Sequence, residues 1–146
     1  MSKVESADLI LKLYDLRREA KMREARNWIL SFFPETAQDV MQAMINPETS
    51  AYYRMVTSYW NMAASFVNHG AIDEEMFNES AGEHIVVFSK IEPFLAELRE
   101  TMGNPNMFGH LEKLIMRQPD AKEKLAQSRE TMKRWMDARK QMSQNA

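Results

Sequence analysis

The stretch YYRMVTSYWNMAASFV, residues 52–67, predicts the central element of the fold. Its apolar side chains recur at helical spacing and cover more than half of the helix circumference. The narrow polar strip that remains consists of Arg54, Ser58, Asn61 and Ser65. The sequence Asn46-Pro47-Glu48 upstream has the features of a helix N-terminus: a capping residue, a proline in the first turn and an acidic residue. We therefore expect a central helix, surrounded by other elements because it is apolar on most sides.

Helix-ending and helix-starting signals follow this stretch. Gly70 has the position of a C-terminal stop, and Asp73 has the position of the next N-cap, with Ile72 and Phe77 at the spacing of a hydrophobic staple. The one β-branched run, residues 85–87, lies inside a longer helical pattern instead of an alternating one. The chain has only 4 Gly and 5 Pro, which fall between the periodic segments. These patterns favour helices throughout and no strand.

We predict an all-α fold: a single helical domain over residues 1–146, built as a bundle of six or seven helices with long first and last helices. Hydrophobic residues make up 45% of the chain and aromatic residues 10%, which is enough to form one core. The helix that follows Ala81-Gly82 is expected to pack beside the central one, with a bend at Pro93. Asp120 and Glu123 are spaced like a capping box at the start of the last helix.

The first helix is expected to run from about Ser6 to Phe33, because no residue between them breaks a helix. Its apolar residues lie on two different faces, Leu9, Leu13, Leu16 and Ala20 on one and Ala25, Trp28 and Phe32 on the other. A chain of 146 residues can hardly cover both faces of such a rod. We therefore predict a homodimer, with an interface drawn from Leu9, Leu13, Leu16 and Trp135.

Charge and composition narrow the function classes. The chain has 19 Lys and Arg against 21 Asp and Glu, a net charge of −2, so the total charge does not favour nucleic acid. Both terminal segments are basic and residues 34–119 are acidic, either because the ends pack against the middle or because an anionic partner binds them. Without cysteine there is no disulfide, thiol nucleophile or thiolate metal site. With neither a secretory signal nor an apolar run of about eighteen residues, we expect a cytoplasmic protein without a transmembrane segment.

Residues Tyr59–Arg99 resemble the middle of an uncharacterised bacterial all-helical domain family. The segments that carry the resemblance are YWNMAASFVNHGAIDEEMFNE and HIVVFSKIEPFLAELR. The alignable positions are Trp60, Ala63, Ala64, Gly70, Ile72, Asp73, Phe88, Pro93 and Arg99. The resemblance implies a helical fold but no activity, and the N-terminal membrane helices of some members are not expected in this chain.

Few residues are arranged for catalysis or metal binding. The three histidines, His69, His84 and His110, form no His or Glu pair at the spacing of a helical metal site. The acidic residues between 73 and 83 could gather a hard cation, but their spacing is unlike a calcium loop, and acidic residues are favourable in a first helical turn anyway. No nucleophile elbow or phosphate-binding glycine loop occurs. We expect no catalytic residues, metal or cofactor; an enzyme would have to use scattered carboxylates.

Three functions remain open. The first is a non-catalytic interaction domain that binds itself or another protein. The second is a helical protein that binds a small molecule or metal in a pocket near Trp60, His84 and Arg99. The third is a peripheral binder of anionic surfaces through the last helix, where a basic ridge flanks the stripe that carries Trp135. The ridge consists of Lys122, Arg129, Lys133 and Lys140. Nucleic acid is not an expected partner, because no recognisable helix-turn-helix is present.

Overall fold

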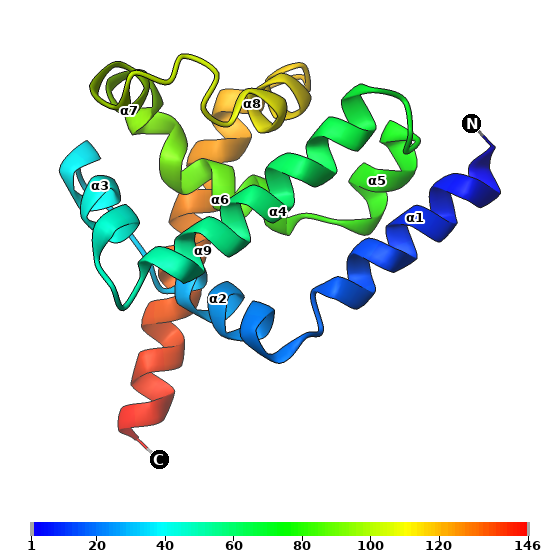
Figure 1. Cartoon of the computed structure of the whole chain (residues 1–146). Coiled ribbons are helices and arrows are strands. Elements are labelled where there is room, and N and C mark those ends of the chain that lie inside the picture. The colour runs from blue at the N-terminus through cyan, green and yellow to red at the C-terminus, as the bar shows by residue number, and fades with distance from the viewer. Residues whose placement is uncertain (1, 146) are drawn as a thin grey trace.

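The computed structural model describes residues 2–145, and these residues form nine α-helices, one 3₁₀-helix and no strand (Figure 1). The elements are α1 Lys3–Leu16, α2 Ala20–Leu30, α3 Ala37–Ile45, α4 Ser50–Asn68, α5 Glu74–Ser80, α6 Glu83–Ile91, η1 Glu92–Phe94, α7 Leu95–Met102, α8 Gly109–Met116 and α9 Ala121–Gln144. The predicted all-helical fold class is confirmed. The helices outnumber the predicted six or seven because two of the predicted helices are divided.

Helix α4 lies at the centre of the fold, as its sequence predicts. Its buried residues are Tyr53, Val56, Thr57, Tyr59, Trp60, Ala63, Ala64 and Val67. Helices α2 and α8 pack most extensively against it, while α6 packs mainly against α9. The predicted pairing of the central helix with the next long one is therefore only a minor contact. Thr57 and Trp60 face the core from α4 and are almost fully buried.

The predicted single helix from Ser6 to Phe33 is wrong, because the chain changes direction between α1 and α2. Helix α1 ends at Leu16, and Glu19 begins α2 by accepting a hydrogen bond from the backbone nitrogen of Met22 at 2.9 Å. The change of direction lets Leu13 on α1 and Ala25 on α2, which point in different directions on a straight helix, both be buried, while Leu16 stays 56% exposed. Packing therefore overrides the uninterrupted helical propensity of the segment. The argument for a spare face on a long first helix is removed with it.

The other local signals were right only in part. Helix α4 begins at Ser50 after Thr49, and the predicted N-cap Asn46 instead ends α3. Gly70 adopts φ +80° after α4, and Asp73 caps α5 by accepting a hydrogen bond from the Met76 nitrogen at 3.0 Å. At Pro93 the expected bend occurs as the succession of α6, η1 and α7. The capping box predicted at Asp120 is wrong: this residue has φ +56° and its side chain makes no capping hydrogen bond. Its left-handed backbone belongs to the sharp turn between α8 and α9, whereas an N-cap residue normally has an extended backbone.

Lys90 on α6 secures the end of α2. Its side chain is buried, and Nζ donates hydrogen bonds to the carbonyl oxygens of Phe32, at 2.8 Å, and Leu30, at 3.5 Å. The ammonium also lies 3.8 Å from the centroid of the Phe33 ring. Burial disfavours the charged form and lowers the pKa of Lys90 to about 8. This contact anchors the carbonyl groups at the end of α2, which have no partner within that helix.

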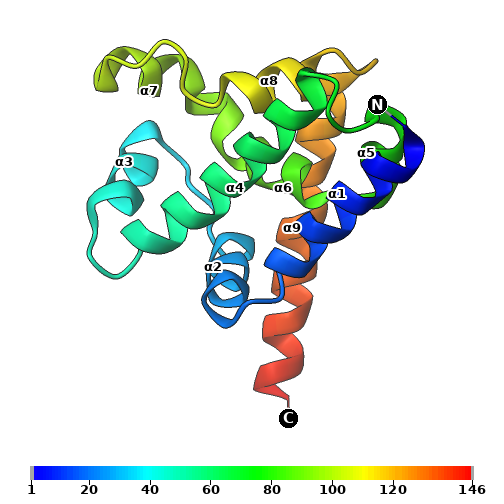
Figure 2. The same cartoon turned by 45° about the vertical axis from the view of Figure 1, so that its right-hand side comes forward.

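Helix α9 begins against the body and then extends beyond it. Ala121 and Leu125 are buried, and no later residue of α9 up to Gln144 is. Figures 1 and 2 agree that the C-terminal part of the helix continues past the other elements. In the same views α1 lies beside α5, at the other side of the molecule. The last helix is thus long, as predicted, but only its first half is covered.

Candidate functional site

Trp60 and His84, two of the three predicted pocket residues, are brought together in the core. Their ring centroids are 5.8 Å apart, and Phe77 lies 5.0 Å from the His84 ring. His84 is only 1% exposed, and burial lowers its pKa to about 4, so the imidazole is uncharged at neutral pH. Neither Trp60 Nε1 nor His84 Nδ1 has a hydrogen-bond partner among the described residues. The cluster therefore contains two unpaired polar atoms in an apolar environment.

A pocket of about 200 Å³ adjoins this cluster, and His84 is one of the residues that line it. Helices α5, α6, α8 and α9 and the α8–α9 connection all contribute to it. The apolar part of the lining is formed by Ile85, Leu114, Ile115 and Ala121. The polar part is formed by Asn78, His84, Gln118 and Lys124. A small, mainly apolar space with a few polar groups is the usual construction of a ligand pocket.

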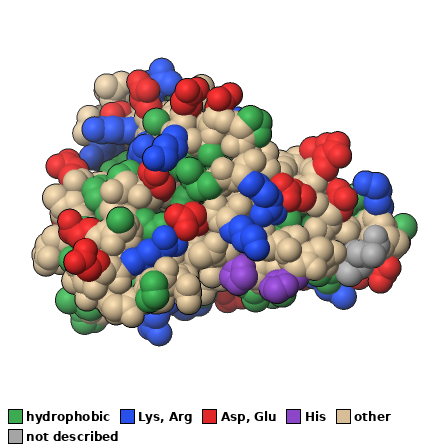
Figure 3. Space-filling model, turned by 90° about the horizontal axis from the view of Figure 1, so that it is seen from above, with side chains coloured by type: hydrophobic (Ala, Val, Ile, Leu, Met, Phe, Trp, Pro, Cys, Tyr) green, Lys and Arg blue, Asp and Glu red, His purple; other side chains and the backbone are tan. Residues whose placement is uncertain are grey.

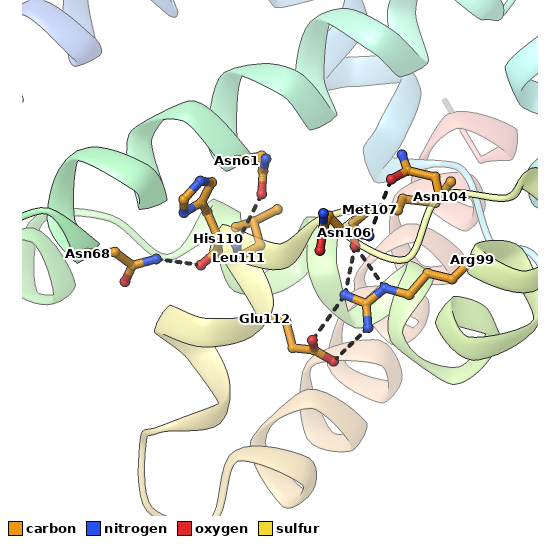
Figure 4. A network of polar contacts seen from close by, with 9 residues as sticks. All are labelled: Asn61, Asn68, Arg99, Asn104, Asn106, Met107, His110, Leu111 and Glu112. Carbon is orange, nitrogen blue, oxygen red and sulfur yellow. Dashed lines mark hydrogen bonds and ion pairs between the residues drawn. The ribbon is translucent and has the colours of Figure 1, made fainter.

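Arg99, the third predicted pocket residue, lies elsewhere and fixes the connection between α7 and α8 (Figure 4). Its Nη2 donates to the carbonyl oxygen of Met107 at 2.7 Å, and Nε donates to the same oxygen at 3.1 Å. Its guanidinium also pairs with Glu112 at 3.0 Å. In the same region Asn61 accepts a hydrogen bond from the Leu111 nitrogen at 3.1 Å. The predicted constellation of Trp60, His84 and Arg99 is therefore not assembled.

The predicted interface residues have different environments. Leu13 is buried, and its carbonyl oxygen accepts a hydrogen bond from the Tyr59 hydroxyl, while Leu9 is partly buried against the core. Leu16 is 56% exposed and Trp135 is 66% exposed. Two of the four side chains are thus largely accessible, one at the end of α1 and one on α9.

An open apolar groove of about 570 Å³ lies between the C-terminal half of α9 and the adjoining parts of α2 and α6. Its apolar lining includes Leu30, Val86, Met132, Trp135, Met136 and Met142. Arg26 and Glu83, at its edge, are paired with each other at 2.9 Å. Arg139, the other charged lining residue, lies on α9 itself. Met132, Met136 and Met142, together with Trp135 on the same helix, therefore form one side of this groove.

The basic ridge predicted along α9 is interrupted. Arg129 donates a hydrogen bond to the carbonyl oxygen of Ser89 at 2.7 Å, and its guanidinium lies 3.7 Å from Glu92. These contacts hold α9 to the end of α6. Lys122, Lys133 and Lys140 are exposed but are separated by the position at which Arg129 turns inward. The ridge therefore presents fewer free positive charges than its sequence predicts.

The other histidines and the acidic residues form no metal centre within residues 2–145. His69 and His110 lie next to each other, with ring centroids 5.9 Å apart, and Figure 3 shows two histidines side by side on one face. No group of three or more His, Asp or Glu side chains in the described chain is placed to hold a metal ion. The same face carries interspersed positive and negative side chains (Figure 3).

Residues 3–118 match the family model described as Domain of unknown function (DUF4760). The chain belongs to this family. The match confirms the predicted membership of an uncharacterised domain family and extends well beyond Tyr59–Arg99. It ends before α9, so the C-terminal helix lies outside the DUF4760 match. No curated protein and no solved structure matches the chain significantly. Within the described residues, no helix combines the length and apolar character required to cross a membrane.

Asn78, Gln118 and Lys124 line the pocket beside His84 but were not among the predicted site residues. Lys124 belongs to α9, outside the DUF4760 match, and Gln118 is the last residue within it. These residues come from α5, the α8–α9 connection and α9, and the packing of these elements brings them together. The spacing of residues along the sequence does not indicate which side chains from separate helices lie close together. The exposed apolar half of α9, by contrast, is visible in the sequence as a stripe at helical spacing.

Proposed function

We propose that this protein is an interaction domain that self-associates through the C-terminal half of α9 and the groove beside it. The observation that carries the proposal is an apolar stripe on α9 that is buried at the N-terminal end of the helix and exposed at its C-terminal end. Ala121 and Leu125 pack into the body, whereas Trp135 is 66% exposed and Met142 is 75% exposed. All four residues lie on one helical face.

Exposed side chains of these types favour binding to another protein. Tryptophan and arginine are enriched among the residues that dominate interface energies, and methionine suits adaptable apolar surfaces. Trp135, Met136 and Arg139 lie together along the groove. Because the charges of Arg26 and Glu83 are already paired with each other, covering that part of the groove leaves no isolated charge there.

A second copy of the chain is the occupant that fits this surface best. The groove and the protruding half of α9 are adjacent parts of one face, since Met132 and Trp135 line the groove from α9 itself. In a two-fold dimer each copy presents the same patch to the other. The α9 end of one molecule can then enter the groove of its mate while the reverse contact forms at the same time. Met142 and Leu30 would be covered by this arrangement.

Sedimentation velocity over low-micromolar to near-millimolar concentrations tests the proposal. We expect a monomer–dimer equilibrium for the native chain and a dimer weakened about 30-fold or more in Trp135→Ala, since loss of a central interface tryptophan typically costs about 2 kcal/mol or more. The matched control is Tyr14→Ala, which removes an exposed aromatic ring from α1. Circular dichroism verifies that both variants retain their helices.

Two results would overturn the proposal. The first is a native chain that stays monomeric at every concentration, because the protein then does not self-associate. A dimer that survives Trp135→Ala but is lost in Tyr14→Ala would assign the interface to α1 and not to α9.

A further inference from the structure

The stripe on α9 contains one charged residue, Arg139, at a position where helix pairs normally have an apolar side chain. Its members recur at alternating steps of four and three residues: Ala121, Leu125, Ser128, Met132, Trp135, Arg139 and Met142. These steps are the a and d positions of a heptad repeat, the pattern of a helix that pairs with another helix. The last four members all line the groove, and we call them the outer stripe. A single polar residue at such a position weakens helix pairing but fixes its register.

Arg139 needs a partner when the outer stripe is covered, because a buried unpaired charge is costly. Within the described residues it makes no ion pair. Glu83, at the edge of the groove, is already paired with Arg26 at 2.9 Å. Glu130 and Asp137 each follow a stripe position by two residues, so they lie on the opposite face of α9. The acidic residues of the groove and of the exposed half of α9 are therefore not available to Arg139.

The indole ring of Trp135 is the other group of the outer stripe that attracts a cation. The side chain is 66% exposed, and within the described chain no cation lies over its ring. A guanidinium over the face of a tryptophan ring is attracted by the ring quadrupole, and this attraction increases when the two groups are removed from water. Arginine suits such a contact because its guanidinium is planar and weakly hydrated.

Helix geometry gives the register in which two copies make this contact. In an antiparallel pair, Arg139 of one copy lies opposite Trp135 of the other when the two-fold axis passes beside position 137. The same axis places Met132 of one copy opposite Met142 of the other, so every member of the outer stripe is covered. A shift of one heptad towards the N-terminus would place Met142 opposite Leu125, which is buried in the body of the other copy. A shift in the other direction removes Met132 and Trp135 from the overlap of the two outer stripes.

We propose that two copies pair their α9 helices antiparallel about a two-fold axis beside position 137, with Arg139 of each copy stacked on Trp135 of the other. This inference rests on the proposed self-association and adds the direction, the register and the residue pair that selects the partner. A helix with the same apolar residues but without the arginine and the tryptophan is then a poorer partner than a second copy of this chain.

Cross-linking tests the register, because the native chain has no cysteine. Met132→Cys and Met142→Cys are prepared separately, mixed in equal amounts and treated with a short bis-maleimide. We expect cross-linked dimers in the mixture but not in either variant alone, since two copies of the same position are about 15 Å apart along the helix axes in this register. Parallel pairing predicts the opposite result. Lys133→Cys, on the exposed face of α9, replaces Met132→Cys in the control mixture and should give no cross-linked dimer.

Sedimentation velocity tests the contact between Arg139 and Trp135. Arg139→Gln is expected to weaken the dimer at least about fivefold, because the amide has no charge to place over the ring. Arg134→Gln makes the same change at an exposed position of α9 that does not line the groove, and we expect a dimer within about twofold of native strength. When Trp135→Leu is already present, Arg139→Gln should no longer weaken the dimer, because the ring that holds the cation is gone.

The outcomes separate this inference from the self-association on which it rests. If the native chain dimerises but the mixture gives no cross-link, or if either cysteine variant is cross-linked alone, the antiparallel register is wrong and self-association stands. A dimer that is unchanged or tighter in Arg139→Gln overturns the contact with Trp135. A native chain that is monomeric at every concentration overturns both proposals. Circular dichroism shows whether each variant keeps its helices, so loss of pairing and loss of the fold are distinguished.

Discussion

Acidification should destabilise this protein through His84, and replacing that residue with phenylalanine should remove the effect. Burial lowers the pKa of His84 from 6.5 to about 4 in the folded protein. Between these two values the unfolded chain binds a proton that the folded chain does not. The free energy of unfolding therefore falls as pH decreases through this window, and the contribution of His84 is fully lost below about pH 4.

The structure also gives the size of the effect. Each pKa unit corresponds to about 1.36 kcal/mol, so the difference between 6.5 and about 4 amounts to about 3 kcal/mol. His84→Phe retains an aromatic ring beside Phe77 and Trp60 but cannot be protonated. The change also removes the unpaired nitrogen from the core.

Urea denaturation at several pH values between 7 and 4 measures this contribution. Between pH 7 and 4 we expect the free energy of unfolding of the native chain to fall by about 3 kcal/mol more than that of His84→Phe. The carboxylate groups contribute equally to both proteins, so their effect cancels in this comparison. His69→Gln, at an exposed histidine, serves as the control and should show the native pH dependence. If the native chain and His84→Phe lose the same free energy between pH 7 and 4, the assignment of acid sensitivity to the buried imidazole is refuted.

Three further predictions concern local contacts. The pKa of Lys90 is about 8 in the folded protein, so the unfolded chain binds more protons above that value. Stability should accordingly rise by about 2 kcal/mol from pH 7 to 9.5 in urea titrations, and this rise should be absent in Lys90→Met. Asp73→Ala removes the hydrogen bond to the Met76 nitrogen and should cost about 1 kcal/mol of unfolding free energy, whereas an unchanged urea midpoint would show that the cap is dispensable. Arg99→Lys cannot reproduce the forked contact to the Met107 carbonyl and Glu112, so amide hydrogen exchange should become faster in the α7–α8 connection but not in α4. Exchange rates in the connection equal to those of the native chain would contradict this role.

The parts of the fold that the sequence predicts are those decided by neighbouring residues. The stop at Gly70 and the cap at Asp73 depend on backbone conformation and on a contact three residues away, and both are confirmed. The central position of α4 follows from the apolar residues around its circumference. The break after Leu16 could not be predicted in this way, because it arises from which faces of α1 and α2 the core buries.

The candidate sites show the same difference between features of one helix, which the sequence predicts, and contacts between helices, which it does not. The stripe that places Trp135 on an exposed face is a property of one helix and is visible in its spacing. The pocket combines His84 from α6 with Lys124 from α9. Arg99, on α7, contacts the α7–α8 connection instead. Which side chains meet across helices depends on packing angles, and no short sequence pattern specifies them.

One continuous helix, α9, contributes to both the pocket and the groove. Lys124 and Trp135 are separated by about 16 Å along its axis, at 1.5 Å per residue. Because the helix is rigid along this length, a change in tilt at Lys124 also displaces the protruding end. The packing of Ala121 and Leu125 against the body therefore sets the direction in which Trp135 and Met142 project into the solvent.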